Sequence, residues 1–281
     1  MNKVFNPEKN TWSSLLKRPL YSLDSVKDIV DEIFTNVELK GDEALVEYTN
    51  KFDKVNLNDL IVSDKKIKNS ENDIDKDLKE SINIAFNNIY KFHKNQIFVP
   101  KKIETSLGVF CWQEKRAIEN VGLYIPGGTA PLFSTVLMLA IPAMIANCKN
   151  IVLCSPPNEN GELHPAILYC AKLCKVNKVI CVGGAQSIAA MSIGTESVPK
   201  VNKIFGPGNQ YVTYAKLKSI NFNTAIDMPA GPSELLVLAD QYANPEYIAS
   251  DLLSQSEHGP DSQVIFVSLS RSLINDVEKC I

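Results

Sequence analysis

Two side chains toward the C-terminal end of the sequence have types and a spacing that could bind a metal ion. Gln255 and His258 lie three residues apart in a predicted helix, which begins with Asn244 as its cap and Pro245 at its first position. This spacing presents an amide oxygen and an imidazole on one face of the helix. Two ligands do not make a site, and the pair also fits a polar helix end where the helix dipole favours a histidine. The residues alone leave both interpretations open.

The segment before this helix has the composition of a tight loop followed by a strand. Pro229, Gly231 and Pro232 fall within residues 227–233, so these residues cannot form a helix or a central strand. The run 234–239 is almost wholly apolar and predicts a buried strand. The loop therefore leads into the core of a domain.

Between residues 118 and 233, apolar strands alternate with helical segments, which is typical of a parallel sheet with crossover helices. The predicted strands are 121–125, 150–154, 178–182 and 203–205, and the predicted helices are 131–147, 164–175, 185–193 and 210–219. Three strands end in glycine-containing turns, at residues 126–128, 183–184 and 206–208. Ligands of open α/β sheets bind at the carboxyl ends of strands, so three such turns predict a nucleotide site. None has the GxGxxG pattern of an ordinary Rossmann site.

Residues 1–98 are predicted to be helical. Apolar residues recur on one face from Val26 to Phe34, and Gly41 ends this first helix. A second helix is predicted over residues 42–52, and a long one carries apolar residues from 78 to 92. The Lys- and Asn-rich stretch 55–72 is interpreted as a connection. His93 and His164 are interpreted as ordinary residues near helix ends.

Composition excludes several classes of function. The 281 residues are 45% hydrophobic and 22% charged, which predicts a globular chain long enough for two domains. A net charge of -3 gives no electrostatic reason to bind nucleic acid or an anionic membrane. No stretch predicts a transmembrane helix or a signal peptide, so a cytoplasmic location is expected.

Most of the seven cysteines lie in apolar runs, where reduced thiols behave as small hydrophobic side chains. These are Cys148, Cys154, Cys170, Cys174 and Cys181. The role of Cys111, within Val109-Phe110-Cys111-Trp112, stays open, because neither a nearby base nor a helix N-terminus that would activate it is evident.

Long segments of the sequence closely resemble histidinol dehydrogenases. They are IDMPAGPSE at 226–234, QSEHG at 255–259, VGLYIPGGTAPLFSTVLMLA at 121–140, GGAQSIAAM at 183–191 and KIFGPGNQYVTYAK at 203–216. The resemblance runs from about residue 20 to the end. Small departures are Ala117, where the family usually has proline, and Ser256, where it usually has alanine.

The resemblance implies a fold and a set of site residues. The fold would be α/β, with incomplete Rossmann-like domains of aldehyde-dehydrogenase-like architecture and a helical N-terminal region. Residues 1–118 with 234–281 would form a first domain, and 119–233 an inserted NAD-binding domain. The implied NAD contacts are Tyr124, Gln186 and Asn209, the implied zinc ligands are Gln255 and His258, which also meet the substrate, and Ser233 is an implied substrate contact.

The activity implied by the resemblance is that of an oxidoreductase of histidine biosynthesis. Histidinol dehydrogenases are homodimers that oxidise L-histidinol to L-histidine through an aldehyde, with zinc and two NAD. The family's catalytic Glu-His pair and remaining zinc ligands have no counterpart here, since His93, His164 and His258 are the only histidines. We therefore interpret the chain as C-terminally truncated, and its own activity stays open.

Two other functions fit the sequence. A related NAD-dependent aldehyde dehydrogenase would need a reactive cysteine in a strand-end loop and no zinc. A module that binds NAD or forms a dimer without catalysis would need only the binding residues. Metal analysis would separate the first from a zinc enzyme, and a turnover assay would identify the second.

Overall fold

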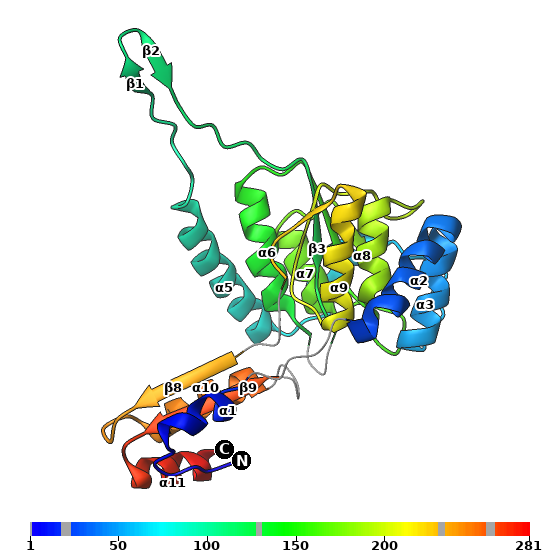
Figure 1. Cartoon of the computed structure of the whole chain (residues 1–281). Helices are drawn as coiled ribbons and strands as arrows, with labels where there is room; N and C mark the ends of the chain where they lie inside the picture. Colours follow the sequence, from blue (N-terminus) through cyan, green and yellow to red (C-terminus); the bar gives the residue numbers. More distant parts are fainter. Residues whose placement is uncertain (1, 18–23, 128–130, 230–233, 257–261) are drawn as a thin grey trace. The chain divides into compact units, whose positions relative to one another are not determined.

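A computed structural model describes the chain except for residues 1, 18–23, 128–130, 230–233 and 257–261 (Figure 1). Its internal contacts divide the chain into two compact units, residues 1–22 with 231–281 and residues 23–230. The domain assignment made from the sequence, 1–118 with 234–281 and 119–233, stays a prediction.

The larger unit is built on a five-stranded parallel sheet with the order β5-β4-β3-β6-β7. The strands are β3 (Asn120–Tyr124), β4 (Asn150–Cys154), β5 (Lys178–Ile180), β6 (Lys203–Phe205) and β7 (Ala225–Ile226). The chain enters the sheet at the central strand β3 and continues outward to β4 and then β5. It then crosses to the other side of β3, where β6 and β7 lie. The predicted α/β class with a parallel sheet is confirmed. The two-residue strand β7 was not predicted.

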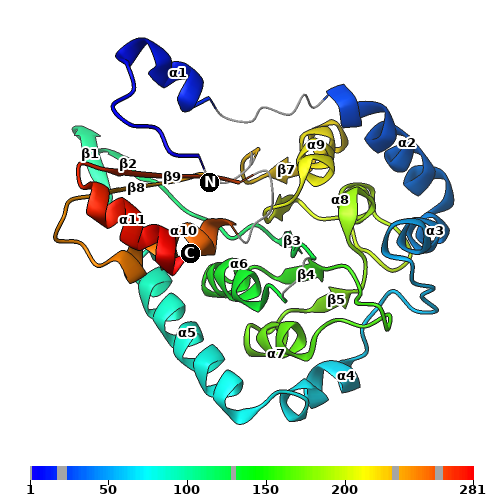
Figure 2. The same cartoon turned by 90° about the horizontal axis from the view of Figure 1, so that it is seen from below.

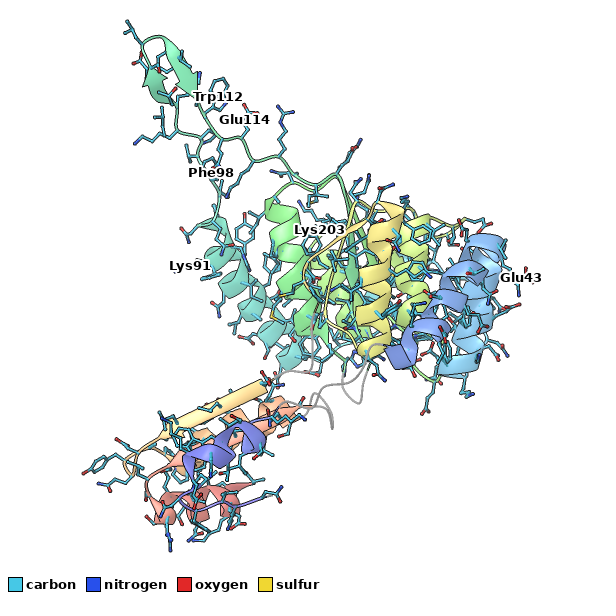
Figure 3. The ribbon with its side chains drawn as sticks, in the orientation of Figure 1. Glu43, Lys91, Phe98, Trp112, Glu114 and Lys203 are labelled. Atoms are coloured by element: carbon cyan, nitrogen blue, oxygen red, sulfur yellow. The ribbon has the colours of Figure 1, made fainter. Side chains whose placement is uncertain are left out.

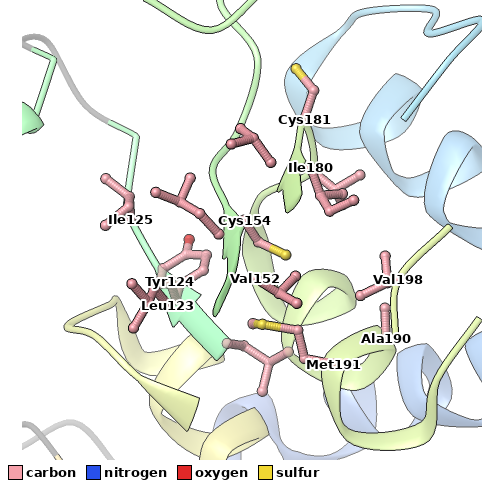
Figure 4. Packing of buried hydrophobic residues seen from close by; sticks show 14 of the residues in the cluster. Leu123, Tyr124, Ile125, Val152, Cys154, Ile180, Cys181, Ala190, Met191 and Val198 are labelled. Carbon is pink, nitrogen blue, oxygen red and sulfur yellow. The ribbon is translucent and has the colours of Figure 1, made fainter. Parts of the chain in front are cut away.

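Helices cover both faces of this sheet (Figure 2). One face carries α6 (Phe133–Ile145) and α7 (Pro165–Leu173), and the other carries α8 (Gly184–Ile193) and α9 (Gln210–Ser219). Side chains between these layers, such as Leu123, Val152 and Met191, are almost fully buried (Figure 4). Because both faces are covered, the central strands are apolar on both sides, which explains their continuous hydrophobic runs.

The N-terminal helices pack outside these layers. The helices α2 (Asp24–Lys40) and α3 (Asp42–Asp53) contact α8, while α5 (Lys76–Lys94) contacts α6. The stretch predicted as a connection contains α4 (Asp64–Asn69), which contacts α7, and the short 3₁₀ helix η2 (Ser70–Asn72). A second 3₁₀ helix, η3 (Ile220–Phe222), follows α9. The prediction missed α4 because six mostly polar residues have no apolar period.

An antiparallel hairpin leads from α5 to the sheet. It consists of β1 (Ile103–Ser106) and β2 (Val109–Cys111), and every residue from 94 to 117 is exposed. We call residues 94–117 the arm. The sequence did not predict its strands.

The smaller unit contains a two-stranded parallel sheet, β8 (Glu234–Ala239) with β9 (Gln263–Ser268). Apolar side chains of one sheet face pack against α10 (Pro245–Ser256) and α11 (Arg271–Cys280). The unit also contains η1 (Lys9–Thr11) and α1 (Trp12–Leu15). On the other sheet face Leu236 is 55% and Leu238 73% exposed, so the prediction that 234–239 is a buried strand was wrong for that face. In the parts of the chain that the structure describes, no helix is long and apolar enough to span a membrane.

Candidate functional site

Two of the predicted glycine turns meet at Tyr124, the last residue of β3. The backbone N–H of Gly184, at the start of α8, donates to the Tyr124 hydroxyl at 3.2 Å. Gly206, directly after β6, has φ 130° and packs so closely that an added Cβ would lie 2.1 Å from the Tyr124 carbonyl oxygen. The carboxyl ends of β3, β5 and β6 therefore come together, as the sequence predicted for a nucleotide site.

Glycine also permits close packing elsewhere at this edge. A Cβ on Gly127, after β3, would lie 2.6 Å from the Pro156 ring, and a Cβ on Gly183 would lie 2.4 Å from it. Pro156 follows β4, so these three strand ends contact one another through atoms that leave no room for side chains. This explains why the turns contain glycine.

Gln186 lies in the first turn of α8 and is only 1% exposed. Neither its Nε2 nor its Oε1 has a hydrogen-bond partner among the described residues. Its Oε1 turns back toward Gly184, where an added Cβ would lie 2.5 Å away. Leaving buried polar atoms without partners costs about 1–3 kcal/mol each, so the amide is suited to bind a ligand at the glycine turn.

Asn209 and Tyr124 also lie at the carboxyl edge of the sheet, where each has a different structural role. The Asn209 Oδ1 accepts a hydrogen bond of 3.1 Å from the Val212 N–H and so caps α9, while its amide NH₂ stays available on an exposed side chain. Tyr124 is 4% exposed, and burial raises the pKa of its phenol, so the hydroxyl stays neutral near pH 7.

Gln210 beside Asn209 was not predicted as a site residue, yet its Oε1 is also buried without a partner among the described residues.

An ion pair between a buried lysine and an exposed aspartate holds the turn after β6. Lys216 on α9 is 2% exposed, pairs with the Asp227 carboxylate and donates to the Gly206 carbonyl oxygen at 2.7 Å. The Asp227 Oδ2 in turn accepts from the Gly206 N–H at 2.9 Å. Sequence analysis did not single out either residue, because a lysine in a short helix is usually exposed.

The predicted zinc and substrate residues belong to the smaller unit or fall outside the described residues. Gln255 lies in the last turn of α10, and its Nε2 is buried without a partner in the described part of the chain. Ser233 and His258 lie outside the described residues. Within the described ranges, no group of three or more His, Cys, Asp or Glu side chains could hold a metal ion. A catalytic zinc site usually has three protein ligands, so the described residues do not complete one.

The cysteines at the strand ends are poorly suited to act as nucleophiles. Cys154 is the last residue of β4 and Cys181 directly follows β5. Burial raises the pKa of both thiols, that of Cys181 to about 12. Cys111 is exposed on the arm. A thiol with a raised pKa carries almost no thiolate at neutral pH, so the strand-end thiols give no support to an aldehyde dehydrogenase with a cysteine nucleophile.

The two described histidines have structural roles. His93, in the last turn of α5, lies with its Nδ1 2.8 Å from the Gln96 Oε1. The His164 Nδ1 accepts from the Ala166 N–H at 3.1 Å and caps α7. This agrees with their interpretation from the sequence as ordinary residues near helix ends.

Comparison with known proteins identifies the family. The sequence profile of histidinol dehydrogenase matches residues 16–281. The chain belongs to the histidinol dehydrogenase family. A crystal structure of histidinol dehydrogenase from Elizabethkingia anophelis superposes with a TM-score of 0.91 at 50% identity, over 98% of this chain and 64% of that one. The resemblance found in the sequence is thus confirmed, together with the α/β architecture.

Curated histidinol dehydrogenases are similar over nearly the whole chain. The enzyme of Bacteroides thetaiotaomicron is 55% identical over 277 residues, which are 99% of this chain and 65% of the relative. That of Escherichia coli K12 is 52% identical over 95% of this chain and 61% of the relative. A chloroplastic histidinol dehydrogenase of Arabidopsis thaliana is 50% identical over 95% of this chain and 57% of the relative. The chain therefore spans a little under two thirds of the length of its relatives.

Proposed function

We propose that this chain is the NAD-binding part, with some of the zinc and substrate contacts, of an enzyme that oxidises L-histidinol to L-histidine in histidine biosynthesis. The buried Gln186 amide is the observation that carries the proposal, because two unpartnered polar atoms lie beside a glycine turn at the carboxyl edge of the sheet. Family membership and the strand order support the interpretation of this sheet as an incomplete Rossmann-like domain.

The residues at this edge fit a dinucleotide. The first turn of α8 offers backbone N–H groups and the positive end of a helix dipole, which suit a pyrophosphate. The Gln186 amide can both donate and accept, and the Asn209 NH₂ can donate. Tyr124 positions the turn through its bond to Gly184. Bound NAD would supply the hydride acceptor, while these residues would bind and orient it.

Zinc would be held in part by Gln255 and His258, with Ser233 beside the substrate. The support for this assignment is the family match and the unpartnered Gln255 amide nitrogen, which leaves the amide free to present its oxygen to a metal. We derive no chemical step from zinc, since the described residues provide only one of its ligands.

We propose that the 281 residues by themselves bind NAD without ordinary turnover. With His258 assigned to zinc, His93 and His164 remain, and both are engaged at helix ends of the larger unit. Within the described part of the chain, neither histidine is hydrogen-bonded to a glutamate, as a proton-transfer pair would need. Losing a general base typically reduces the rate about 100- to 10,000-fold.

The binding test is calorimetric titration of NAD into the chain and into Gln186→Leu, with Gln241→Leu, at an exposed position of the smaller unit, as the matched control. Gln186→Leu removes the unpartnered amide without emptying its space, so it should stay folded. We expect its Kd for NAD to rise about tenfold, from the loss of about one ligand hydrogen bond, and the control to bind like the wild type. An unchanged Kd would contradict the proposal.

The turnover test adds L-histidinol, zinc and NAD to the folded chain and follows NADH by absorbance. Turnover at an ordinary enzymatic rate would contradict the proposal that these residues lack the proton-transfer pair. NAD binding with no NADH formation would support it.

We further propose that the enzyme is a homodimer in which the arm binds a second copy of the chain. The arm exposes apolar side chains, including Leu107 at 99% and Val99 at 79%, and a lone hairpin is marginally stable in water. Its described polar contacts are mostly internal, such as the 3.1 Å bond from Trp112 Nε1 to Glu114 (Figure 3). Light scattering should give a dimer for the wild type and for Lys101→Glu, and a monomer for Leu107→Glu. A dimer of Leu107→Glu would contradict this assignment of the arm.

A further inference from the structure

Asp53, the last residue of α3, has a carboxylate oxygen that no described residue satisfies. Its Oδ2 is buried without a hydrogen-bond partner, and burial raises the pKa of the carboxyl group. Thr49 lies one helical turn earlier on the same face. It is 0% exposed, and its Oγ1 also has no partner among the described residues. One face of α3 therefore presents two unpartnered oxygen atoms.

Chain pairing brings this end of α3 to the carboxyl end of the sheet. Ile61 pairs antiparallel with Ile180 of β5, and the Cys181 N–H donates to the Leu60 carbonyl oxygen at 2.8 Å. Because the pairing is antiparallel, residues that precede Leu60 lie beyond the carboxyl end of β5. Burial is the main cause of the raised pKa of the Tyr124 phenol and of the Cys181 thiol, each at a strand end, and the Asp53 charge adds to both shifts.

Among the described residues of the larger unit, most unpartnered buried polar atoms lie on two helices that touch, and one more, the Gln210 Oε1, lies on α9. The helix α3 packs against α8, which carries Gln186. Of the six buried side-chain atoms without partners in the described residues, four belong to Thr49, Asp53 and Gln186. Asp53 is half-buried, but its Oδ2 is shielded from solvent, and Thr49 and Gln186 are almost fully buried; shielded polar atoms in folded proteins usually have a hydrogen-bond partner. The cluster is therefore better explained by a ligand.

The chemistry of Asp53 specifies what that ligand presents. An ionised carboxylate only accepts hydrogen bonds, so its partner must donate. In a dinucleotide bound at the neighbouring glycine turn, the ribose hydroxyls are donors, whereas a phosphate would be repelled. Ordinary Rossmann domains bind the ribose with an acid about 20 residues after the glycine fingerprint, and this sequence has no such fingerprint.

We propose that Asp53 accepts hydrogen bonds from a ribose of the bound dinucleotide and selects against a 2′-phosphate, so that the chain prefers NAD to NADP. This inference rests on the proposed function. It assigns the ribose-binding acid to α3, which precedes the sheet in the sequence, and gives Thr49 as a neighbouring acceptor or donor in the same cluster.

The test is titration of NAD and of NADP into the full chain and into Asp53→Asn. The substitution keeps the shape of the side chain and removes its charge. We expect the Kd for NAD to rise about 10- to 100-fold, as for loss of hydrogen bonds to a charged group, and the Kd for NADP to fall. Glu43→Gln is the matched control, because Glu43 is exposed on the same helix (Figure 3) and should leave both values unchanged.

The outcomes separate this inference from the function on which it rests. If the wild type binds NAD and Asp53→Asn binds both nucleotides as the wild type does, the role of Asp53 is wrong and the NAD assignment stands. If the wild type binds neither nucleotide, both are wrong. A thermal melt checks folding, and Asp53→Asn should melt no earlier than the wild type because it removes a desolvated charge.

Discussion

Lys216 and Asp227 together hold the turn after β6, although Lys216 lies on α9 and Asp227 directly follows β7. Lys216 donates to the Gly206 carbonyl oxygen at 2.7 Å, and Asp227 accepts from the N–H of the same glycine at 2.9 Å. The Asp227 Oδ1 also accepts from the Met228 N–H at 2.7 Å. The pair thus fixes the backbone next to Tyr124 and the start of the loop that leads to Ser233.

Lys216→Met should lower the free energy of unfolding by about 2 kcal/mol, because the Gly206 carbonyl oxygen loses the hydrogen bond from a buried charged donor. Lys218→Met is the matched control on the same helix. Lys218 pairs with Asp31 at a more exposed position, so about 1 kcal/mol or less is expected there. Urea unfolding of both variants measures the difference. Equal losses would contradict the importance of the buried lysine.

Gly206→Ala should be strongly destabilising, by more than about 2 kcal/mol, since it adds a steric clash to the strain of a positive φ. The added Cβ would lie 2.1 Å from the Tyr124 carbonyl oxygen at φ 130°. Gly108→Ala, at φ 80° with no atom within 4 Å of the added Cβ, carries the strain alone and should cost about 1 kcal/mol. Denaturant midpoints compare them, and a milder effect at Gly206 would contradict the close approach.

The stability gained by Asp53→Asn should depend on pH. Burial raises the pKa of Asp53 in the folded state above its ordinary value of 3.8, so the folded state binds the proton more tightly. Asp53 therefore destabilises the fold at neutral pH, and this penalty disappears as the pH falls through the raised pKa toward 3.8. Thermal melts between pH 4 and pH 7, in roughly half-unit steps, should show the variant's advantage shrink on acidification. An advantage that grows would contradict the raised pKa.

Thiol labelling should distinguish two exposed cysteines from the others. Cys111 and Cys280 are exposed, whereas four cysteines are buried. Burial raises the pKa of the buried thiols, to about 12 for Cys170, Cys174 and Cys181. An aromatic disulfide reagent at about pH 8 should modify Cys111 and Cys280 quickly and the buried thiols only on unfolding. Fast labelling at Cys181 by mass spectrometry would contradict its burial.

Local patterns in the sequence predicted much of the fold. Continuous apolar runs gave β3, β4, β5 and β6, and the Asn244 cap with Pro245 gave the start of α10, where the Asn244 Oδ1 accepts from the Glu246 N–H at 2.9 Å. Elements without a local signal were missed. The strand β7 has two residues, too few for a period, and the arm exposes its apolar residues to solvent, where no core imposes an alternation.

The sequence by itself determined the strands, the glycine turns and the family, because propensities and motifs depend on residues close together in the chain. Only the tertiary structure decided that α3 packs against α8, which carries Gln186, and that Lys216 is buried against Gly206. It also decided that one face of β8 is exposed, since burial depends on which helices cover a sheet. These relationships join segments that are distant in the sequence, and their physical cause is the packing of α3 and α9 around one sheet edge.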